Sequence, residues 1–549
     1  MADLQNSEET LGSYLTSLAG AAGLPGIINW PPDAFACAAS LLERSGAYIH
    51  VVSDWPPPIE SGHTWSSFVG ALGSAWKDQS ARGKEAPEKV SKIWAEVLKE
   101  LDLPTRAIGE RANTRGRRIF RALVKILAAA DEACMGVGIP GGLPFGDKLG
   151  DQITEQLLKQ QEDDVSSTLC RQIVSSKLLV LPKLHTPQSG ITIRSLSHHL
   201  ALSSAPEITP HWNWVYSPIL TGARHGINVL VVPWPLRITP EQFFPATPRN
   251  GRLRNMDDRF GFFEFSSRQR EPLNVRRLKL VVQRALSEVG QIDLIVFPEL
   301  ALEERDVPAV TRLVASLSRT PIVIAGVCLR PRQKGGPCKN VSVTIVPQIP
   351  ERGVENSFTT FYQAKHHRWK LDGHQVRQYG LGGTLDPSVD WWEHISVERR
   401  EVTFMALQSW LTLCTLVCED LARPDPIASL VRTVGPNLIV GLLLDGPQLA
   451  KRWPARYGTV LADDPGSSIL TVSPFGMVRL SRPRGAQPSN VVALWKDSRC
   501  GEPIEVSLPS DREAIVLSLT RHWCEEFTAD GRGDGGWSSC LELSGVHPI

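Results

Sequence analysis

The chain has 549 residues, more than one compact core usually holds, so two or more structural units are expected. Hydrophobic residues make up 42% of the chain and charged residues 21%, as in an ordinary globular protein. The formal net charge of +1 gives no global field that would point to nucleic acid or to a membrane surface as a partner.

The N-terminus, MADLQNSEETLGSYL, is acidic and polar, and it lacks the basic start and apolar core of a secretory signal. The longest apolar runs, 227–236 and 438–444, reach at most half of the roughly 20 residues that a membrane-spanning helix needs. The ten cysteines are scattered without a paired framework, which suits a reducing compartment. These features predict a cytoplasmic protein that makes no use of a membrane.

Residues 1–185 are predicted to form a mainly helical accessory domain. Ile93, Val97 and Leu101 recur at helical spacing. The stretch 111–130 interleaves basic and apolar side chains, which indicates either a docking face for an acidic protein partner or the solvated face of an amphipathic helix. The Gly-rich run 136–147 ends this helical pattern and is predicted to be a loop.

From about residue 190, short β-like runs alternate with helical stretches, which predicts a layered α/β domain. We expect a connecting segment with an extra strand over 186–254, the α/β domain over 255–522, and a Gly-rich C-terminal tail over 523–549. A helix is predicted over 273–290. The predicted strands cover 227–236, 260–266, 293–299, 321–329, 340–347, 358–364, 402–408, 411–418, 437–445, 467–473, 491–497, 503–509 and 514–520.

Three of these strands end in residues that can carry chemistry. Glu299 closes the apolar run 293–299, at the kind of strand end where α/β sheets bind ligands, although alone it could be a helix cap or a surface residue. Lys365 follows another strand and could be a surface lysine in a basic loop. Cys418 could be a small buried core residue, but a thiol at a strand-to-helix turn can also be activated by backbone N–H groups.

Taken together, the three segments resemble the nitrilase, or carbon–nitrogen hydrolase, superfamily. That family has a Glu in an FPE context, here Glu299, then a Lys after an Asn-led strand pair, here Asn340 leading to Lys365. A Cys then ends a later strand, here in Cys418-Glu419-Asp420. The order and the spacing fit, and the stretches 435–440 and 452–477 continue the agreement, so the resemblance covers roughly residues 255–522.

The resemblance implies a four-layer αββα sandwich, preceded here by the mainly helical domain. It also implies an enzyme that hydrolyses a non-peptide carbon–nitrogen bond in a small amide or nitrile, of which we favour the amide; whether acyl transfer replaces hydrolysis stays open. Cys418 would attack and form a thioester, Glu299 would be the base, and Lys365 would stabilise the anion together with the backbone N–H after the cysteine. The resemblance calls for no metal and no organic cofactor. It implies a homo-oligomer, and the helical region would bind a protein partner or assist assembly.

The chain departs from the family pattern around the lysine, where many members carry a second carboxylate. The candidates are Asp372, Gln375 and Glu393, and we favour Asp372 because a short separation keeps it on the same loop as the lysine. Lys370 is a rival for the place of Lys365. The loop 379–394 is expected to lie over the pocket. The residues expected to bind the substrate are Asp372, Glu393, Glu419 and Asp445.

A second hypothesis comes from a different functional class. The chain could be a module of nitrilase fold that binds a small metabolite or a protein without turnover, for example as an effector in a bacterial defence or signalling system. The presence of Glu299, Lys365 and Cys418 favours an enzyme, whereas loss of the second carboxylate would favour the binding module. The identity of the substrate stays open.

Overall fold

The computed structural model describes residues 9–549 apart from 20–22, 54–58, 60–61, 140–147, 164, 205–207, 216–225, 247–256, 266–271, 331–335, 349–356, 398 and 482–487. Most of the loop expected over 136–147 therefore lies outside the described residues. None of the helices within the described ranges has both the length and the apolar character needed to cross a membrane.

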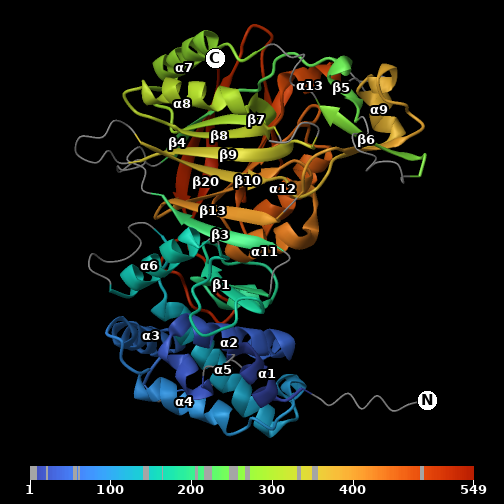
Figure 1. The fold of residues 1–549 in the computed structure, drawn as a ribbon. Coiled ribbons are helices and arrows are strands. Elements are labelled where there is room, and N and C mark those ends of the chain that lie inside the picture. The colour runs from blue at the N-terminus through green and yellow to red at the C-terminus, as the bar shows by residue number, and fades with distance from the viewer. Residues whose placement is uncertain are drawn as a thin grey trace.

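The N-terminal part is helical and gathers at one end of the molecule, below the sheets in Figure 1. Its central helix, α5, is capped by the side chain of Asn113, which accepts a hydrogen bond of 3.0 Å from Gly116 N. Helices α2, α3 and α4 all pack on α5. The helices are α1 (Leu11–Ala19), α2 (Pro31–Arg44), α3 (Trp65–Ala81), α4 (Glu88–Leu98), α5 (Thr114–Ala133) and α6 (Lys148–Glu162).

Two seven-stranded sheets form the α/β part of the described chain, in the orders β10-β9-β8-β7-β4-β19-β20 and β18-β17-β16-β15-β14-β13-β3. The first consists of β4 (Gly226–Val231), β7 (Leu294–Glu303), β8 (Ile322–Leu329), β9 (Lys339–Pro347), β10 (Phe358–Ala364), β19 (Ile515–Trp523) and β20 (Ser539–Pro548). The second consists of β3 (Thr209–Trp214), β13 (Glu401–Gln408), β14 (Leu411–Val417), β15 (Leu438–Leu442), β16 (Ser468–Val472), β17 (Val491–Lys496) and β18 (Ile504–Ser507).

The two sheets pack face to face, and the start of strand β7, Leu294 to Phe297, shows why that part of the sequence is apolar. Side chains alternate between the faces of a strand. Leu294 and Val296 enter the core between the sheets, whereas Ile295 and Phe297 enter the core under α7 (Val275–Val289) and α8 (Val307–Ala315). Because both faces are covered here, these four residues form one continuous apolar run.

The outer face of the second sheet is also covered. Helices α11 (Ser429–Val434) and α12 (Trp453–Asp463) pack on this face, so that the layers run helix, sheet, sheet, helix. The same hydrophobic cluster continues into the N-terminal helices, with Leu123 of α5 and Ile469 of β16 among its buried members. The N-terminal helices and the second sheet therefore share one core.

Further contacts join the two parts of the chain. Strand β1 (Leu178–Pro182) pairs with β2 (Leu200–Ser204), so paired strands lie on either side of residue 185. Strand β3 is the edge of the second sheet and runs parallel to β13. Within the segment expected to be a C-terminal tail, β20 pairs with β19, and the buried Arg532 forms an ion pair of 3.3 Å with Asp131 of α5.

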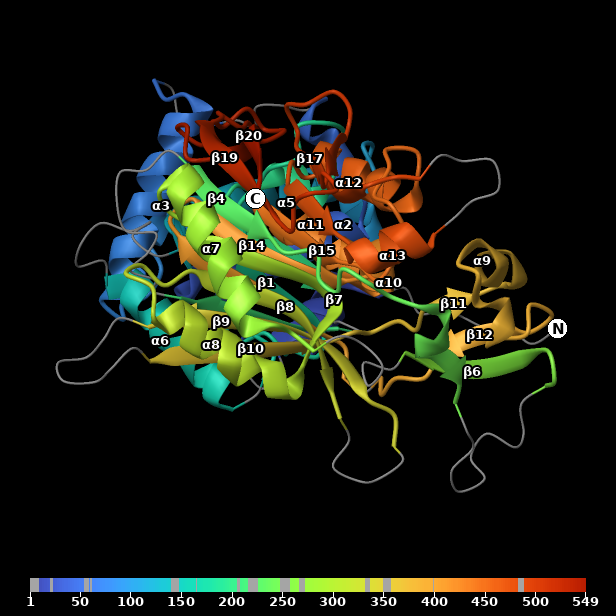
Figure 2. The same ribbon diagram turned by 90° about the horizontal axis from the view of Figure 1, so that it is seen from above.

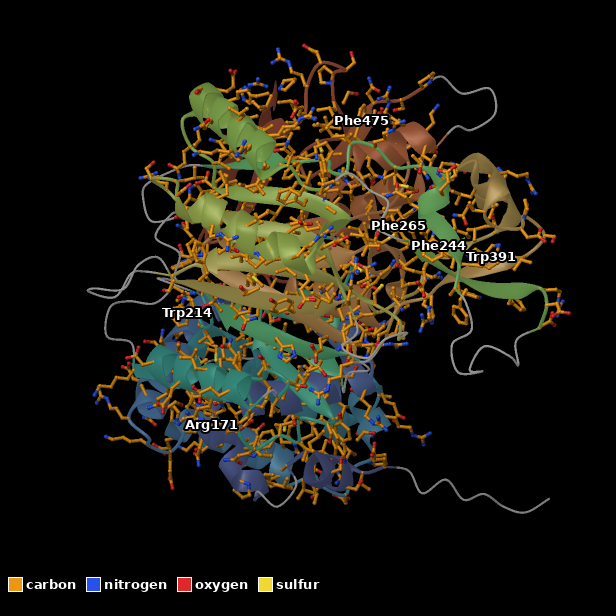
Figure 3. The ribbon with its side chains drawn as sticks, turned by 45° about the horizontal axis from the view of Figure 1, so that its top comes forward. Arg171, Trp214, Phe244, Phe265, Trp391 and Phe475 are labelled. Carbon is orange, nitrogen blue, oxygen red and sulfur yellow. The ribbon has the colours of Figure 1, made fainter. Side chains whose placement is uncertain are left out.

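A small third sheet projects beside the sandwich, on the right in Figure 2. Figure 3 labels three of its aromatic side chains, Phe244, Phe265 and Trp391. The chain 379–394, expected to be a loop, contains strand β12 of this sheet. Its elements are β5 (Phe243–Pro245), β6 (Phe260–Phe265), β11 (Lys370–Leu371) and β12 (Asp390–Glu393), and α9 (Gly373–Gln378) follows β11.

Candidate active site

Glu299 lies at an irregularity in strand β7. The register between β7 and β8 shifts between Phe297 and Leu302, and Leu300 has a positive φ of 50°. Such a bulge redirects the side chains beside it. Gly326 of β8 leaves space for the bulge, because a Cβ atom at this glycine would lie 2.4 Å from the Cα atom of Glu299. The Glu299 side chain is completely buried.

Cys418 occupies the sharp turn from strand β14 to the short helix α10 (Glu419–Ala422). Its backbone has φ 48° and ψ −108°, and its N–H donates to Leu442 O at 2.9 Å. Among the described residues, Leu300 and Cys418 are the non-glycine residues with positive φ. This conformation costs roughly 1–3 kcal/mol per residue and tends to occur at functional sites. Leu300 directly follows Glu299, and Cys418 is the candidate nucleophile itself.

Lys365 follows strand β10 and is held between two carboxylates. Its backbone N–H donates to Asn340 O at 2.8 Å, which fixes the end of the strand. Its Nζ donates to Glu299 Oε1 at 2.8 Å and to Glu393 Oε2 at 2.6 Å. The ammonium is fully buried, so these bonds are not weakened by exchange with bulk water.

The remaining carboxylate oxygens of this cluster are also occupied. Asn340 Nδ2 bridges the two carboxylates, with 2.7 Å to Glu299 Oε1 and 3.0 Å to Glu393 Oε1. Leu444 N donates to Glu299 Oε2 at 2.6 Å, and Trp369 N donates to Glu393 Oε2 at 3.1 Å. Four donors from three separate segments of the chain therefore fix both carboxylates.

Burial and charge set the protonation of the three chemical groups. Burial raises the pKa of Glu299; Lys365 opposes this rise and Glu393 adds to it. Burial lowers the pKa of Lys365, but Glu299 and Glu393 together hold it well above its ordinary range. Burial, reinforced by Glu299, raises the pKa of the Cys418 thiol. The Cys418 thiol is thus neutral and Lys365 is an ammonium, and the raised pKa of Glu299 makes its carboxylate a stronger base than an exposed one.

Asp420 connects the cysteine turn with the lysine loop. It is buried on helix α10 and accepts hydrogen bonds from His366 N, at 3.1 Å, and from His367 N, at 3.0 Å. His367 Nδ1 lies 2.9 Å from the same carboxylate. Since His366 directly follows Lys365, the Asp420 side chain holds the segments of Lys365 and Cys418 in register.

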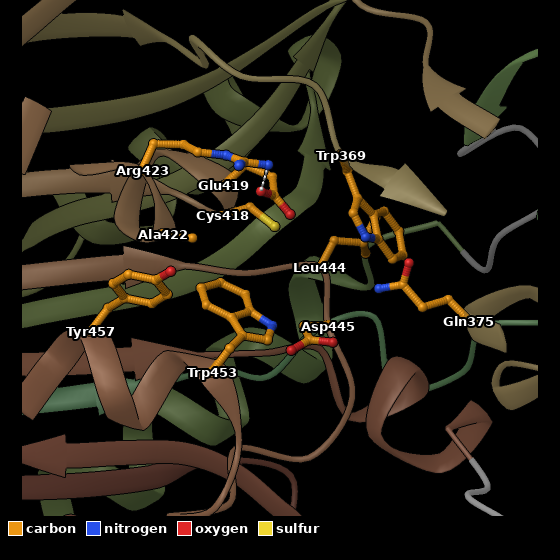
Figure 4. Close-up of a pocket in the computed structure, with 10 residues that line it drawn as sticks. All are labelled: Trp369, Gln375, Cys418, Glu419, Ala422, Arg423, Leu444, Asp445, Trp453 and Tyr457. Carbon is orange, nitrogen blue, oxygen red and sulfur yellow. Dashed lines mark hydrogen bonds and ion pairs between the residues drawn. The ribbon is translucent and has the colours of Figure 1, made fainter. Parts of the chain in front are cut away.

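A pocket of about 220 Å³ opens beside Cys418. Figure 4 shows ten of its lining residues, and the rings of Trp369, Trp453 and Tyr457 are drawn around the thiol and Asp445. Its lining residues are Trp369, Gln375, Cys418, Glu419, Ala422, Arg423, Leu444, Asp445, Trp453 and Tyr457.

Most of the residues expected from the sequence converge here. Glu299, Lys365 and Glu393 form one hydrogen-bonded cluster, and the charges of Glu299 and Lys365 act on the Cys418 thiol. Gln375 and two of the expected substrate-binding residues, Glu419 and Asp445, line the pocket.

The second carboxylate is placed differently from our expectation. The short separation favoured Asp372, but Asp372 is exposed and caps helix α9 by accepting from Gln375 N at 2.8 Å. Glu393 contacts Lys365 instead, because β12 returns to pair with β11 and β6. Lys370, the rival lysine, forms an ion pair of 2.7 Å with Asp390 on that sheet.

Sequence reasoning gave no site role to Asn340, Asp420, Tyr379 or Arg452. In the sequence Asn340 and Asp420 stand out only as parts of motifs, although an amide or a carboxylate beside a candidate triad is a usable signal. Tyr379 and Arg452 both bind Asp445, at 2.5 and 2.8 Å, and no local pattern links these three positions.

No family model matches the chain, and no curated protein matches it in sequence. The solved structures to which it is similar include members of the nitrilase superfamily. Nit3 of Saccharomyces cerevisiae, a member of branch 10 of that superfamily, matches 55% of this chain and 92% of its own, with 14% identity and a TM-score of 0.30. A carbon–nitrogen hydrolase from Helicobacter pylori G27 matches 52% of this chain and 86% of its own, with 13% identity and a TM-score of 0.30. The C. elegans NitFhit protein matches 52% of this chain and 62% of its own, with 11% identity and a TM-score of 0.26.

Proposed function

We propose that the protein hydrolyses a non-peptide carbon–nitrogen bond, in an amide rather than a nitrile, through a thioester on Cys418. The observation that carries the proposal is the buried cluster of Glu299, Lys365 and Glu393 beside a thiol that lines a pocket. A base, a cation and a nucleophile are the groups that acyl transfer from an amide requires.

In the first half of the reaction, Glu299 takes the proton of the Cys418 thiol as the sulfur attacks the carbonyl carbon. The tetrahedral intermediate carries an oxyanion, which the ammonium of Lys365 and the N–H of Glu419 stabilise. Glu299 then gives the proton to the nitrogen, the carbon–nitrogen bond breaks, and ammonia or an amine leaves.

In the second half, Glu299 takes a proton from a water molecule that attacks the thioester. The carbon–sulfur bond breaks, a carboxylic acid is released, and the proton on Glu299 returns to the sulfur of Cys418. Each group ends in its starting state, so the cycle needs no further reactant.

Glu393 acts in this scheme as a positioning residue. It is not among the residues that line the pocket, but its hydrogen bond of 2.6 Å gives the Lys365 ammonium a second carboxylate partner beside Glu299. A second carboxylate on the lysine also favours turnover over the alternative of a module that only binds. A site that only bound a metabolite would not need a base, a buried ammonium and a cysteine with strained backbone in one cluster.

The proposal is tested by incubating the full chain with a library of primary amides and nitriles and measuring the release of ammonia. We expect turnover of at least one amide, complete loss in Cys418→Ala, and near-normal turnover in Cys414→Ala. Cys414 is the matched control because it is also buried and lies four residues earlier, in strand β14. Equal turnover by Cys418→Ala and the unaltered chain would refute the proposal.

A further inference from the structure

The pocket beside Cys418 is small and has an unusual combination of walls. Its volume of about 220 Å³ lies below the roughly 300–1,000 Å³ of pockets for drug-sized ligands, so it accepts a small molecule or the end of a larger one. Three aromatic rings, those of Trp369, Trp453 and Tyr457, share the lining with the carboxylates of Glu419 and Asp445. Ring faces and carboxylates together attract cations.

The two carboxylate oxygens of Asp445 differ in their hydrogen bonds. Its Oδ1 accepts from Tyr379 Oη at 2.5 Å, from Arg452 Nη2 at 2.8 Å and from Gly446 N at 2.7 Å. Its Oδ2 is buried and has no hydrogen-bond partner among the described residues. The whole residue is only 5% exposed and lines the pocket.

A buried acceptor left without a donor costs roughly 1–3 kcal/mol. The three donors on Oδ1 hold the carboxylate in place, so Oδ2 cannot turn away to find another partner. A donor that reaches Oδ2 must therefore come from a molecule in the pocket.

The cations around the pocket are already paired. Arg423 donates to Glu419 at 3.1 Å, Arg452 to Asp445, and Lys365 to Glu299 and Glu393. A substrate with its own carboxylate would meet Glu419 and Asp445 without a free positive partner among these residues. A substrate with an ammonium group could donate a hydrogen bond to Asp445 Oδ2 and pack against the aromatic rings.

We propose that the substrate is a small amide that also carries a protonated amine. The ammonium donates to Asp445 Oδ2 and packs against Trp369 and Trp453, while the amide carbon lies against the Cys418 sulfur. This inference rests on the proposed function for the identity of the reacting group. It adds the charge of the substrate and names Asp445 as the residue that selects it.

The test uses binding without turnover, which separates the two proposals. The full chain carrying Cys418→Ala is titrated calorimetrically with 4-aminobutanamide, butanamide and the monoamide of butanedioic acid. We expect the amine to bind at least about tenfold more tightly than butanamide, which corresponds to roughly 1.4 kcal/mol, and the acid to bind most weakly. Adding Asp445→Asn should remove this preference, because the new Nδ2 donor repels an ammonium while Oδ1 can keep its three donors.

Asp386→Asn in the same background is the control for loss of a negative charge. Asp386 is exposed and accepts from Ser388 N at 2.8 Å and Ser388 Oγ at 2.7 Å, so the change should leave the preference intact. Equal or tighter binding of butanamide, binding of none of the three amides, or an amine preference that survives Asp445→Asn would overturn the inference. Acyl transfer from amides by the unaltered chain would then still support the proposed function, whereas amine-selective binding without any acyl transfer would contradict that function alone.

Discussion

Glu393 accepts a hydrogen bond of 2.6 Å from the ammonium of Lys365, although strand β11 and helix α9 lie between them in the chain. The Lys365 ammonium thus donates both to Glu393 and to the proposed base, Glu299, which accepts at 2.8 Å. Two negative charges on one buried cation leave the cluster with an excess of negative charge. The two carboxylates together hold the pKa of Lys365 well above its ordinary range, and Glu393 adds to the rise that burial gives the pKa of Glu299.

Glu393→Gln should slow amide turnover on the order of 100-fold and move the acid limb of the pH profile of kcat/KM to lower pH. The rate falls because the Lys365 ammonium loses one of its two carboxylate partners and is held less firmly where it stabilises the oxyanion. The limb moves because the charge of Glu393 raises the pKa of Glu299, so its removal lowers that pKa and keeps the base ionised in more acidic solution.

Asp372→Asn is the control for this prediction. Asn caps a helix about as well as Asp, so helix α9 should persist and both the rate and the pH profile should match the unaltered chain. If Asp372→Asn were the slower variant, or if Glu393→Gln left the pH profile unmoved, Glu393 would not act through the lysine and the base.

Gly326→Ala should reduce both stability and turnover. The added methyl group would lie 2.4 Å from Glu299 Cα and 2.5 Å from Pro298 O, so strand β7 must shift and carry the base with it. Overpacking of this kind costs roughly 1–3 kcal/mol, which a denaturant titration measures. Gly458→Ala in helix α12 is the matched control, since its nearest neighbour would be Ile469 Cγ2 at 3.7 Å. Equal effects of the two changes would argue against a bulge that depends on Gly326.

Cys418→Gly should be inactive but more stable than Cys418→Ala by about 1 kcal/mol. Glycine adopts φ 48° and ψ −108° without the steric penalty that alanine meets, and this gain exceeds the larger entropy that glycine loses on folding. Denaturation midpoints of the two variants, compared at equal slope, measure the difference. An alanine variant as stable as the glycine variant would show that the turn holding the cysteine is unstrained.

The sequence predicted the parts of the site that continuous patterns mark. The start of strand β7, Leu294 to Phe297, is apolar because both of its faces are buried, and Glu299 follows this run. The strand does not end there, as the sequence indicated, but continues through a bulge to Glu303. The apolar run before Cys418 marks β14 in the same way. Both residues were therefore identifiable without knowledge of the tertiary contacts.

The parts that depend on pairing between distant segments were not predictable from local pattern. Strand β12 is only four residues long and pairs with β6, so nothing near Glu393 indicates that it returns to Lys365. Proximity in sequence favoured Asp372, which instead forms the cap of the helix that follows it. The partners of Asp445, Tyr379 and Arg452, likewise come together only in the folded chain.

The most direct test of the proposed chemistry is intact-mass spectrometry of the full chain, quenched in acid during incubation with an amide that it turns over. We predict a mass increase equal to that of the acyl group, located by peptide mapping on Cys418, absent from Cys418→Ala and retained in Cys414→Ala. An acyl adduct on a different residue, or amide hydrolysis by Cys418→Ala at the rate of the unaltered chain, would contradict a thioester mechanism at Cys418.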